Sequence, residues 1–194
     1  ETIMSDRCDP AGFAVNANLA VVLPMMCHPD PDVALDRALQ GAQFFGYALG
    51  HYYVFGSQQP GRTDIWSAFA AQGTSGFGDT SSTLAGSDGA SKGSDDGVLR
   101  SGIGSPAQLR EVLRRYEDAG VDQVVFLTQA GRTRHDHICE SLTLFANEVM
   151  GEFAARHCDR EAAKQSRLAP AIERALARKA PPRAIGPDYA YTAK

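Results

Sequence analysis

The chain has 194 residues, of which 43% are hydrophobic and 22% are charged. This composition predicts a globular protein with a sizeable core and excludes wholesale disorder. The net charge of −4 and the pI near 5.7 argue against a nucleic-acid partner. The longest apolar run, 19–27, is too short for the roughly 20 residues of a membrane span.

Cysteine, histidine and basic residues narrow the function further. Isolated cysteines without a C-x-x-C motif indicate reduced thiols and a cytoplasmic protein. His135 and His137 are expected on different faces of a helix, so we predict no metal site. The basic residues of the tail alternate with alanine and glutamate, which is typical of a solvated helix face; they are Lys164, Arg167, Arg174, Arg178 and Lys179.

The first strand and helix are predicted between residues 13 and 50. The segment FAVNANLAVVLPMMC, 13–27, begins with alternation and becomes continuously apolar, which indicates a strand buried on both faces. Asp30 and Pro31 then supply a helix cap and a first helical residue. We expect this helix to end between Gly46 and Gly50.

A loop, 70–102, separates this part from the next helix. Its residues 70–97 are rich in glycine, serine and aspartate and carry few apolar anchors. A loop of this length is either a disordered insertion or a lid over an active site, and composition alone favours neither.

The second half repeats the strand and helix pattern. A short strand precedes Ser105, Pro106 and Gln108, which have the spacing of a capping box, and Gly120 ends that helix. The apolar stretch 124–127 is the next strand. Thr133 and Asp136 have capping spacing before a long helix. The apolar stripe expected on that helix consists of Ile138, Leu142, Phe145 and Val149.

Alternating strands and helices predict a parallel sheet, either open and doubly wound or closed as a barrel. In both folds the functional site lies at the carboxyl ends of the strands. Thr128, Gln129 and Arg132 follow the last strand, so they could meet a ligand. The alternative is that Gln129 and Arg132 only cap or solvate a loop.

Residues 101–153 resemble the C-terminal end of the bacterial luciferase-like flavin monooxygenases. The resemblance rests on the helix start at 104–106, the turn at 119–122, the apolar last strand and the closing helix SLTLFANEVM, 141–150. The segments FAVNANLAVV and FFGYALGHYYVFGSQQPGRTDIW extend it, so that it covers most of residues 10–155.

The resemblance implies an α/β fold that is the C-terminal part of a TIM (β/α)8 barrel. Strands six to eight would be present within residues 1–155, followed by a tail, 156–194, and the first five strands would be absent. An incomplete barrel leaves strand edges unpaired. The chain is therefore expected to be a C-terminal fragment, or to receive its other half from a second chain.

The activity implied is that of an FMN-dependent monooxygenase, which uses reduced flavin from a separate flavin reductase and O2 to oxidise a small organic substrate. The full-length protein is expected to be a homo-oligomer, and the loop 70–97 to be a lid. A deazaflavin could replace FMN. The alternative is a non-catalytic flavin-binding or partner subunit related to luciferase.

The candidate residues for binding flavin or substrate come from four segments. Each has a structural alternative: an amide network for the asparagines, outer packing for the tyrosines, helix capping for the 62–66 pair, and an ion pair with Asp136 for Arg132. None has the arrangement of a nucleophile or general base. The candidates are Asn16, Asn18, His51, Tyr53, Arg62, Trp66, Gln129 and Arg132.

Overall fold

The computed structural model describes residues 2–72, 102–181, 186 and 190. Residues 73–97 of the predicted lid, 70–97, lie outside the described residues, whereas residues 70–72 are helical and belong to α3, Ile65–Gln72. The chain divides into two compact units, Asn18–Ala155 on one hand and Glu1–Ala17 with Arg156–Lys194 on the other. The predicted domain 1–155 therefore includes an N-terminal segment that groups with the tail.

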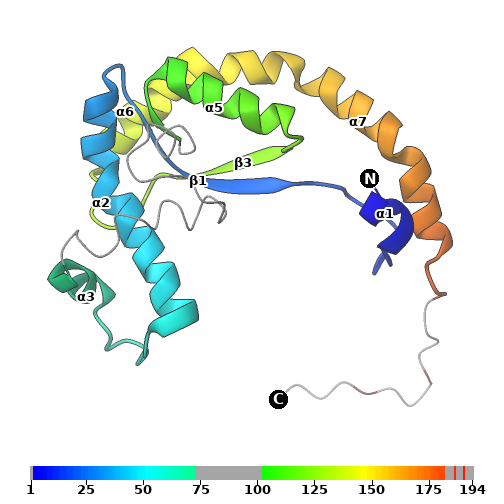
Figure 1. Ribbon diagram of the computed structural model, residues 1–194, viewed down its shortest axis with the longest axis horizontal. Coiled ribbons are helices and arrows are strands. Elements are labelled where there is room, and N and C mark those ends of the chain that lie inside the picture. Colours follow the sequence, from blue (N-terminus) through cyan, green and yellow to red (C-terminus); the bar gives the residue numbers. More distant parts are fainter. Residues whose placement is uncertain (1, 73–101, 182–185, 187–189, 191–194) are drawn as a thin grey trace. The chain divides into compact units, whose positions relative to one another are not determined.

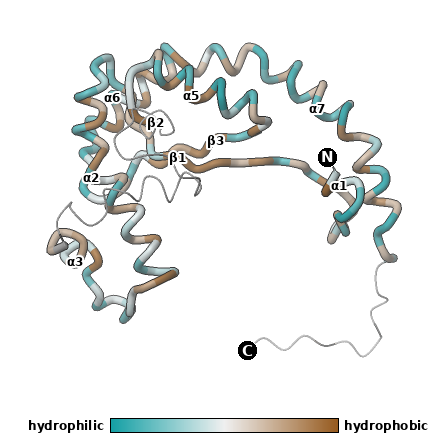
Figure 2. The backbone as a smooth tube through the Cα atoms, in the orientation of Figure 1, coloured by the Kyte–Doolittle hydropathy of each residue, from teal (hydrophilic) through white to brown (hydrophobic). Residues whose placement is uncertain are grey.

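The unit Asn18–Ala155 contains a three-stranded parallel sheet in the order β2-β1-β3. Strand β1 is Ala20–Cys27, β2 is Gly102–Gly104 and β3 is Gln123–Leu127. The carboxyl half of β1 pairs with β2, with Met26 opposite Ile103, and its amino half pairs with β3, with Val22 opposite Val125. In Figure 2, β1 is the hydrophobic segment at the centre of this unit.

Helices cover both faces of β1 (Figure 1). On one face Met26 and Ile103 pack against Ala34 and Ala38 of α2, Pro31–Gly50. On the other face, Met25 and Cys27 pack against α5, Pro106–Asp118, and against the helix that follows β3. That second helix is α6, His135–Phe145, continued by the π-helical turn η4, Ala146–Met150.

This strand order differs from the one that successive strands of a barrel would have. Three successive barrel strands would place β2 between β1 and β3, with their helices on one outer face. Here β1 is central and helices lie on both faces, as in open doubly wound sheets. The chain thus has an α/β fold with a small parallel sheet, and the structure does not show a barrel.

The residues predicted to cap and end helices α2 and α5 are confirmed. Asp30 caps α2, with its carboxylate accepting from the backbone N–H of Asp32 at 2.9 Å. Ser105 and Gln108 form the capping box of α5, in which Gln108 Oε1 accepts from the Ser105 N–H at 2.8 Å. Gly120 follows α5 with φ of +88°, a left-handed conformation that glycine adopts without strain.

Two expected boundaries were wrong and one is confirmed. Strand β1 begins at Ala20 rather than residue 13, because β3 begins at Gln123 and no described strand pairs with residues 13–19. Helix α2 ends at Gly50, within the expected range, and the π-helical turn η1, His51–Phe55, follows it directly. Helix α6 has Arg134 at its N-cap without a side-chain cap, since the Thr133 hydroxyl donates to the Ala130 carbonyl at 2.9 Å.

The apolar stripe of α6 also differs from the expected one. Ile138 and Val149 are buried, but Leu142 is 44% exposed and Ser141 is buried in its place. Ser141 Oγ accepts from the Cys27 backbone N–H at 2.7 Å and lies 3.1 Å from Met25 Sδ. One serine thus attaches the helix to the carboxyl end of β1.

The other unit consists of α1, Thr2–Arg7, and most of α7, Gly151–Ala177, with the segments beside them. Leu168, Ala171 and Ala175 of α7 are buried. The basic residues here do more than solvate a helix, which corrects that prediction. Arg178 donates to the carbonyls of Met4, Ser5 and Cys8, and Lys179 lies 5.1 Å from the ring of Phe13.

Replacing Ser141 by alanine should lower the free energy of unfolding by about 1–3 kcal/mol, because the buried Cys27 N–H loses this acceptor. Denaturant titration followed by circular dichroism measures the change. Thr143→Ala, an exposed position on the same helix, is the matched control and should change stability by less than about 0.5 kcal/mol. Equal effects of the two substitutions would contradict this role for Ser141.

Candidate functional site

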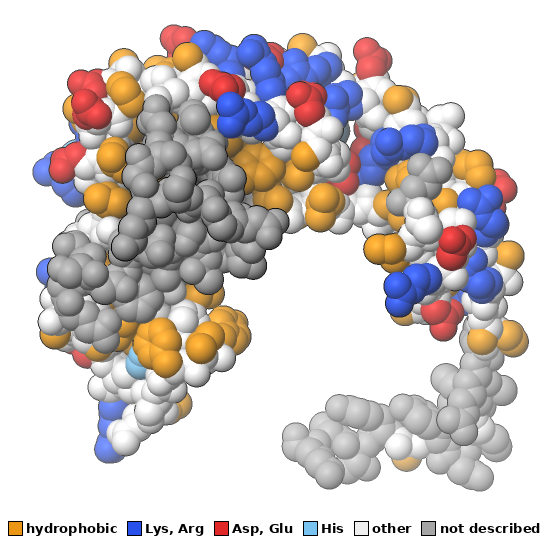
Figure 3. Space-filling view, in the orientation of Figure 1, with side chains coloured by type: hydrophobic (Ala, Val, Ile, Leu, Met, Phe, Trp, Pro, Cys, Tyr) orange, Lys and Arg blue, Asp and Glu red, His pale blue; other side chains and the backbone are white. Residues whose placement is uncertain are grey.

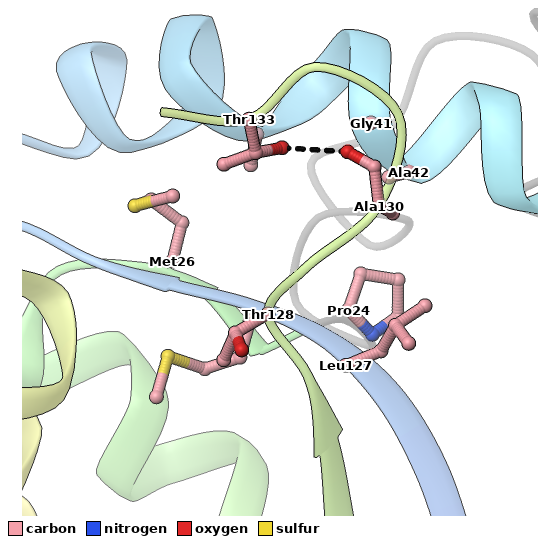
Figure 4. Close-up of a pocket in the computed structure, with 10 residues that line it drawn as sticks. Pro24, Met26, Gly41, Ala42, Leu127, Thr128, Ala130 and Thr133 are labelled. Carbon is pink, nitrogen blue, oxygen red and sulfur yellow. Dashed lines mark hydrogen bonds between the residues drawn. The ribbon is translucent and has the colours of Figure 1, made fainter. Parts of the chain in front are cut away.

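A shallow pocket lies at the carboxyl ends of β1 and β3 (Figure 4). Its floor is the end of β1, one wall is α2, and the other wall is the loop that follows β3. The lining residues are Pro24, Met25, Met26, Ala38, Gly41, Ala42, Leu127, Thr128, Ala130 and Thr133. Because β2 and β3 lie on opposite sides of β1, this is the point where the strand order reverses, the usual ligand position in an open α/β sheet.

Glycines let α2 and the loop after β3 approach closely. A Cβ at Gly41 would lie 2.6 Å from Thr133 Oγ1 and 2.8 Å from the Ala130 carbonyl oxygen. Gly131 has φ of +58°, and a Cβ there would lie 2.8 Å from Cζ3 of Trp66. A larger side chain at Gly41 would therefore push the wall of the pocket outward, and one at Gly131 would displace the Trp66 ring.

Two of the predicted site residues meet beside this pocket. The Arg132 guanidinium carbon lies 4.7 Å from the ring centroid of Trp66, a cation–π contact. Trp66 belongs to α3, Ile65–Gln72, and its ring lies 5.0 Å from that of Phe44 on α2. The Arg132 guanidinium therefore lies at the carboxyl edge of the sheet and packs against the ring of Trp66.

The ion pair considered for Arg132 is made by a different arginine. Arg134 Nε donates to Asp136 at 3.0 Å, and this hydrogen bond holds the pKa of Asp136 well below its usual range. Near Arg132, the pKa of Asp64 is lowered mainly by hydrogen bonds from Ser67, with a smaller electrostatic contribution from Arg132. The guanidinium of Arg132 thus does not brace the loop through Asp136.

Gln129 is exposed and does not line the pocket, contrary to the expected inward orientation. The prediction extended strand alternation to residue 129, but β3 ends at Leu127. Thr128 and Ala130 line the pocket instead.

Asn18 lies at the opposite end of the sheet from Arg132, and Asn16 belongs to the other compact unit. Both are exposed and precede β1, and Asn18 Nδ2 donates to Gln123 Oε1 at 3.2 Å. The length of β3, roughly 13 Å for four steps of about 3.3 Å, separates Gln123 from the carboxyl edge. The structure therefore does not bring Asn18 together with Arg132.

His51 and Tyr53 belong to the turn η1, where hydrophobic side chains gather at the end of α2 (Figure 3). Tyr53 is 83% exposed, whereas His51 is 8% exposed among the rings of Tyr47, Tyr52 and Phe55. Among the described residues, His51 Nε2 is a buried nitrogen without a hydrogen-bond partner. Its imidazole is held by aromatic packing.

Arg62 is exposed in the turn before α3. It is not among the residues that line the pocket. Of the eight predicted residues, only Trp66 and Arg132 are therefore brought together at the carboxyl edge.

Sequence reasoning missed residues that shape this site. Gly41 and Ser141 lie on helices, where their small side chains give no apolar signal, and Tyr47 is 2% exposed in the aromatic group beside η1. Cys27 is buried at the end of β1, and burial raises the pKa of its thiol to about 11. That thiol remains protonated at neutral pH and is no nucleophile.

The described residues do not by themselves fit FMN. The enclosed volume of the pocket is about 10 Å³, room for one water, whereas sites for ligands of this size enclose about 300–1,000 Å³. Within the described ranges, no three His, Cys, Asp or Glu residues are grouped to hold a metal ion.

The helices in the described part of the chain lack the combined length and hydropathy of a bilayer span. Comparison with family models, curated proteins and solved structures found no match to this chain.

Gly41→Ala should destabilise the protein by about 1–3 kcal/mol, because the added methyl overlaps the Ala130 carbonyl and forces the pocket wall to move. Alanine has the higher helix propensity, by about 1 kcal/mol, so a loss of stability cannot come from the helix itself. Gly151→Ala is the control, since nothing lies within 4 Å of its Cβ position. Thermal denaturation should show opposite shifts for the two variants; a stabilised Gly41→Ala protein would contradict the close approach.

Proposed function

We propose that this chain is the C-terminal section of a luciferase-like, FMN-dependent monooxygenase, in which the carboxyl edge carrying Arg132 and Trp66 faces flavin or substrate. The observation that carries the proposal is the meeting of these two residues, 66 positions apart, beside the point where the strand order reverses. The resemblance of residues 101–153 supplies the chemical class.

The local structure supports this reading at the carboxyl edge. In both barrels and open sheets, ligands bind at the carboxyl ends of the strands, so the proposal does not depend on closure of a barrel. The loop 128–133 supplies a hydroxyl, an amide and a cation to that edge. An exposed cation held against an aromatic ring suits an anionic ligand, which reduced flavin is.

The flavin pocket must be completed by surface outside the described residues, because the enclosed space at the edge is too small. Arg132 would bind negative charge, Trp66 would supply an apolar wall, and Thr128 would fix orientation. The cofactor, when bound, supplies the reactivity toward O2, and the protein excludes water. The free thiols of Cys8, Cys27, Cys139 and Cys158 suit a reducing, cytoplasmic setting.

A second candidate is a non-catalytic flavin-binding or partner subunit related to luciferase. It is favoured by the small pocket, which encloses too little space for flavin and substrate within the described residues. The two candidates differ in turnover: the first predicts substrate oxidation dependent on reduced flavin and O2, and the second predicts binding alone.

The chain alone should not bind FMN with a dissociation constant in the micromolar range or below. Titration followed by quenching of flavin fluorescence tests this expectation. The same titration, with reduced FMN and oxygen consumption, should then be made on the product of the complete natural gene. Absence of flavin binding by that product would overturn both candidates, and binding without oxygen-dependent turnover would select the second.

In the complete protein, Arg132→Ala should weaken binding of reduced FMN or substrate about tenfold, the effect of losing one charge-assisted contact. The loss should shrink as ionic strength rises. Arg134→Ala is the matched control, because Arg134 is a neighbouring exposed arginine already paired with Asp136. If both variants bind equally well, Arg132 has no part in the site.

A further inference from the structure

The outer edge of β3 is open in the described part of the chain. The sheet order places β3 at one side, where it pairs with β1 only. Its residues, QVVFL, include no charge and no proline. Edge strands of soluble proteins usually carry a charged residue or a proline, or are covered by another element. Without such protection, the unpaired backbone N–H and C=O groups of an edge strand can pair with a strand of another chain.

One face of the sheet next to this edge is bare and apolar. Val22 is 56% exposed and Val125 is 45% exposed, and the two are opposite each other in the register of β1 and β3. Helix α2 buries Met26 near the carboxyl end of this face and leaves the amino half uncovered. Two β-branched side chains are therefore exposed side by side at an open edge.

We propose that a second copy of this chain pairs with this edge, β3 against β3, antiparallel about a two-fold axis at Val125. The pairing would make one continuous sheet from two three-stranded sheets. It satisfies the open backbone groups of both copies at once, and it extends the bare valine face across the axis.

The sequence of β3 is complementary to itself in this register. Val125 lies opposite Val125 of the second copy, Val124 opposite Phe126, and Gln123 opposite Leu127. The aromatic and β-branched pair is a favourable cross-strand combination. Just beyond the strand, Asp122 lies opposite Thr128, so no like charges meet.

An antiparallel dimer also leaves the candidate site free. The carboxyl ends of the two β3 strands point in opposite directions, so Arg132 and Trp66 of each copy lie at opposite ends of the joined sheet. The dimer does not rest on the proposed function, and its failure would leave that function untouched; a further strand paired with the β3 edge, as in a closed barrel, would exclude the dimer.

Disulfide trapping tests the register. Cys8, Cys139 and Cys158 are first replaced by serine, and the buried Cys27 is kept. Val125→Cys should then cross-link rapidly under mild oxidation, since residues opposite each other in an antiparallel pair have Cα atoms about 4.5–5.5 Å apart, within disulfide reach.

Val22→Cys is the matched control, being equally exposed on the same face but one strand further from the axis. Its two copies would be about 14 Å apart across three strand spacings, beyond disulfide reach. We expect cross-linking of Val125→Cys to be at least about tenfold faster. Equal rates for the two variants would overturn the register.

Sedimentation velocity tests the dimer itself. The unmodified protein should sediment as a dimer at tens of micromolar, and Val125→Lys should raise the dissociation constant at least about tenfold by placing like charges opposite each other. Val22→Lys should remain dimeric. A monomeric unmodified protein, or an open series of larger assemblies, would overturn the proposal; if Val125→Lys fails to fold, trapping and the mass of the unmodified protein still decide it.

Discussion

The burial of consecutive residues on both faces of β1 is the constraint on which the sheet unit depends. Met25, Met26 and Cys27 are each no more than 2% exposed. Because neighbouring residues of a strand point to opposite faces, two separate layers must cover them. Helix α2 supplies one layer, and α5 with the α6–η4 helix supplies the other. The strand order β2-β1-β3 provides these two layers, because it lets successive connections cross on opposite faces.

The same constraint determines where a ligand could bind and how large it could be. The helical connections that cross the two faces of the sheet diverge at the carboxyl ends of β1 and β3, and the pocket lies at that point. Helix α2 must also approach closely enough to bury Met26, and Gly41 allows it to touch the loop after β3. Close packing of this layer therefore leaves little enclosed space. A large ligand at this edge would therefore need to contact protein surface from outside the described residues, while the packing of the core could stay as it is.

Several interactions within four residues of one another could be read from the sequence, although the Thr133–Asp136 cap could not, and those between distant residues could not. Asp30, the Ser105–Gln108 box and Gly120 act locally, so their patterns predicted the helix ends. Ser141 contacts Cys27 across 114 positions, and nothing in the spacing of α6 reveals it. The strand order is likewise non-local, so a parallel sheet was predictable but the position of β3 beside β1 was not. At the site, Arg132 and Trp66 were each found as candidates, whereas their contact was not.

The two ends of β3 carry different kinds of contact. At its carboxyl end the chain leaves the strand into a loop packed under α2, which buries apolar surface and presents Arg132. At the middle of the strand, Val125 lies beside Val22, and both are exposed on the face of the sheet whose other end α2 covers. The helix covers only one half of the strand because it runs from the carboxyl end of β1, and its contacts there are with β1, β2 and the loop. Binding at the carboxyl edge and pairing along the open side of β3 therefore use different atoms of one strand, so neither one excludes the other.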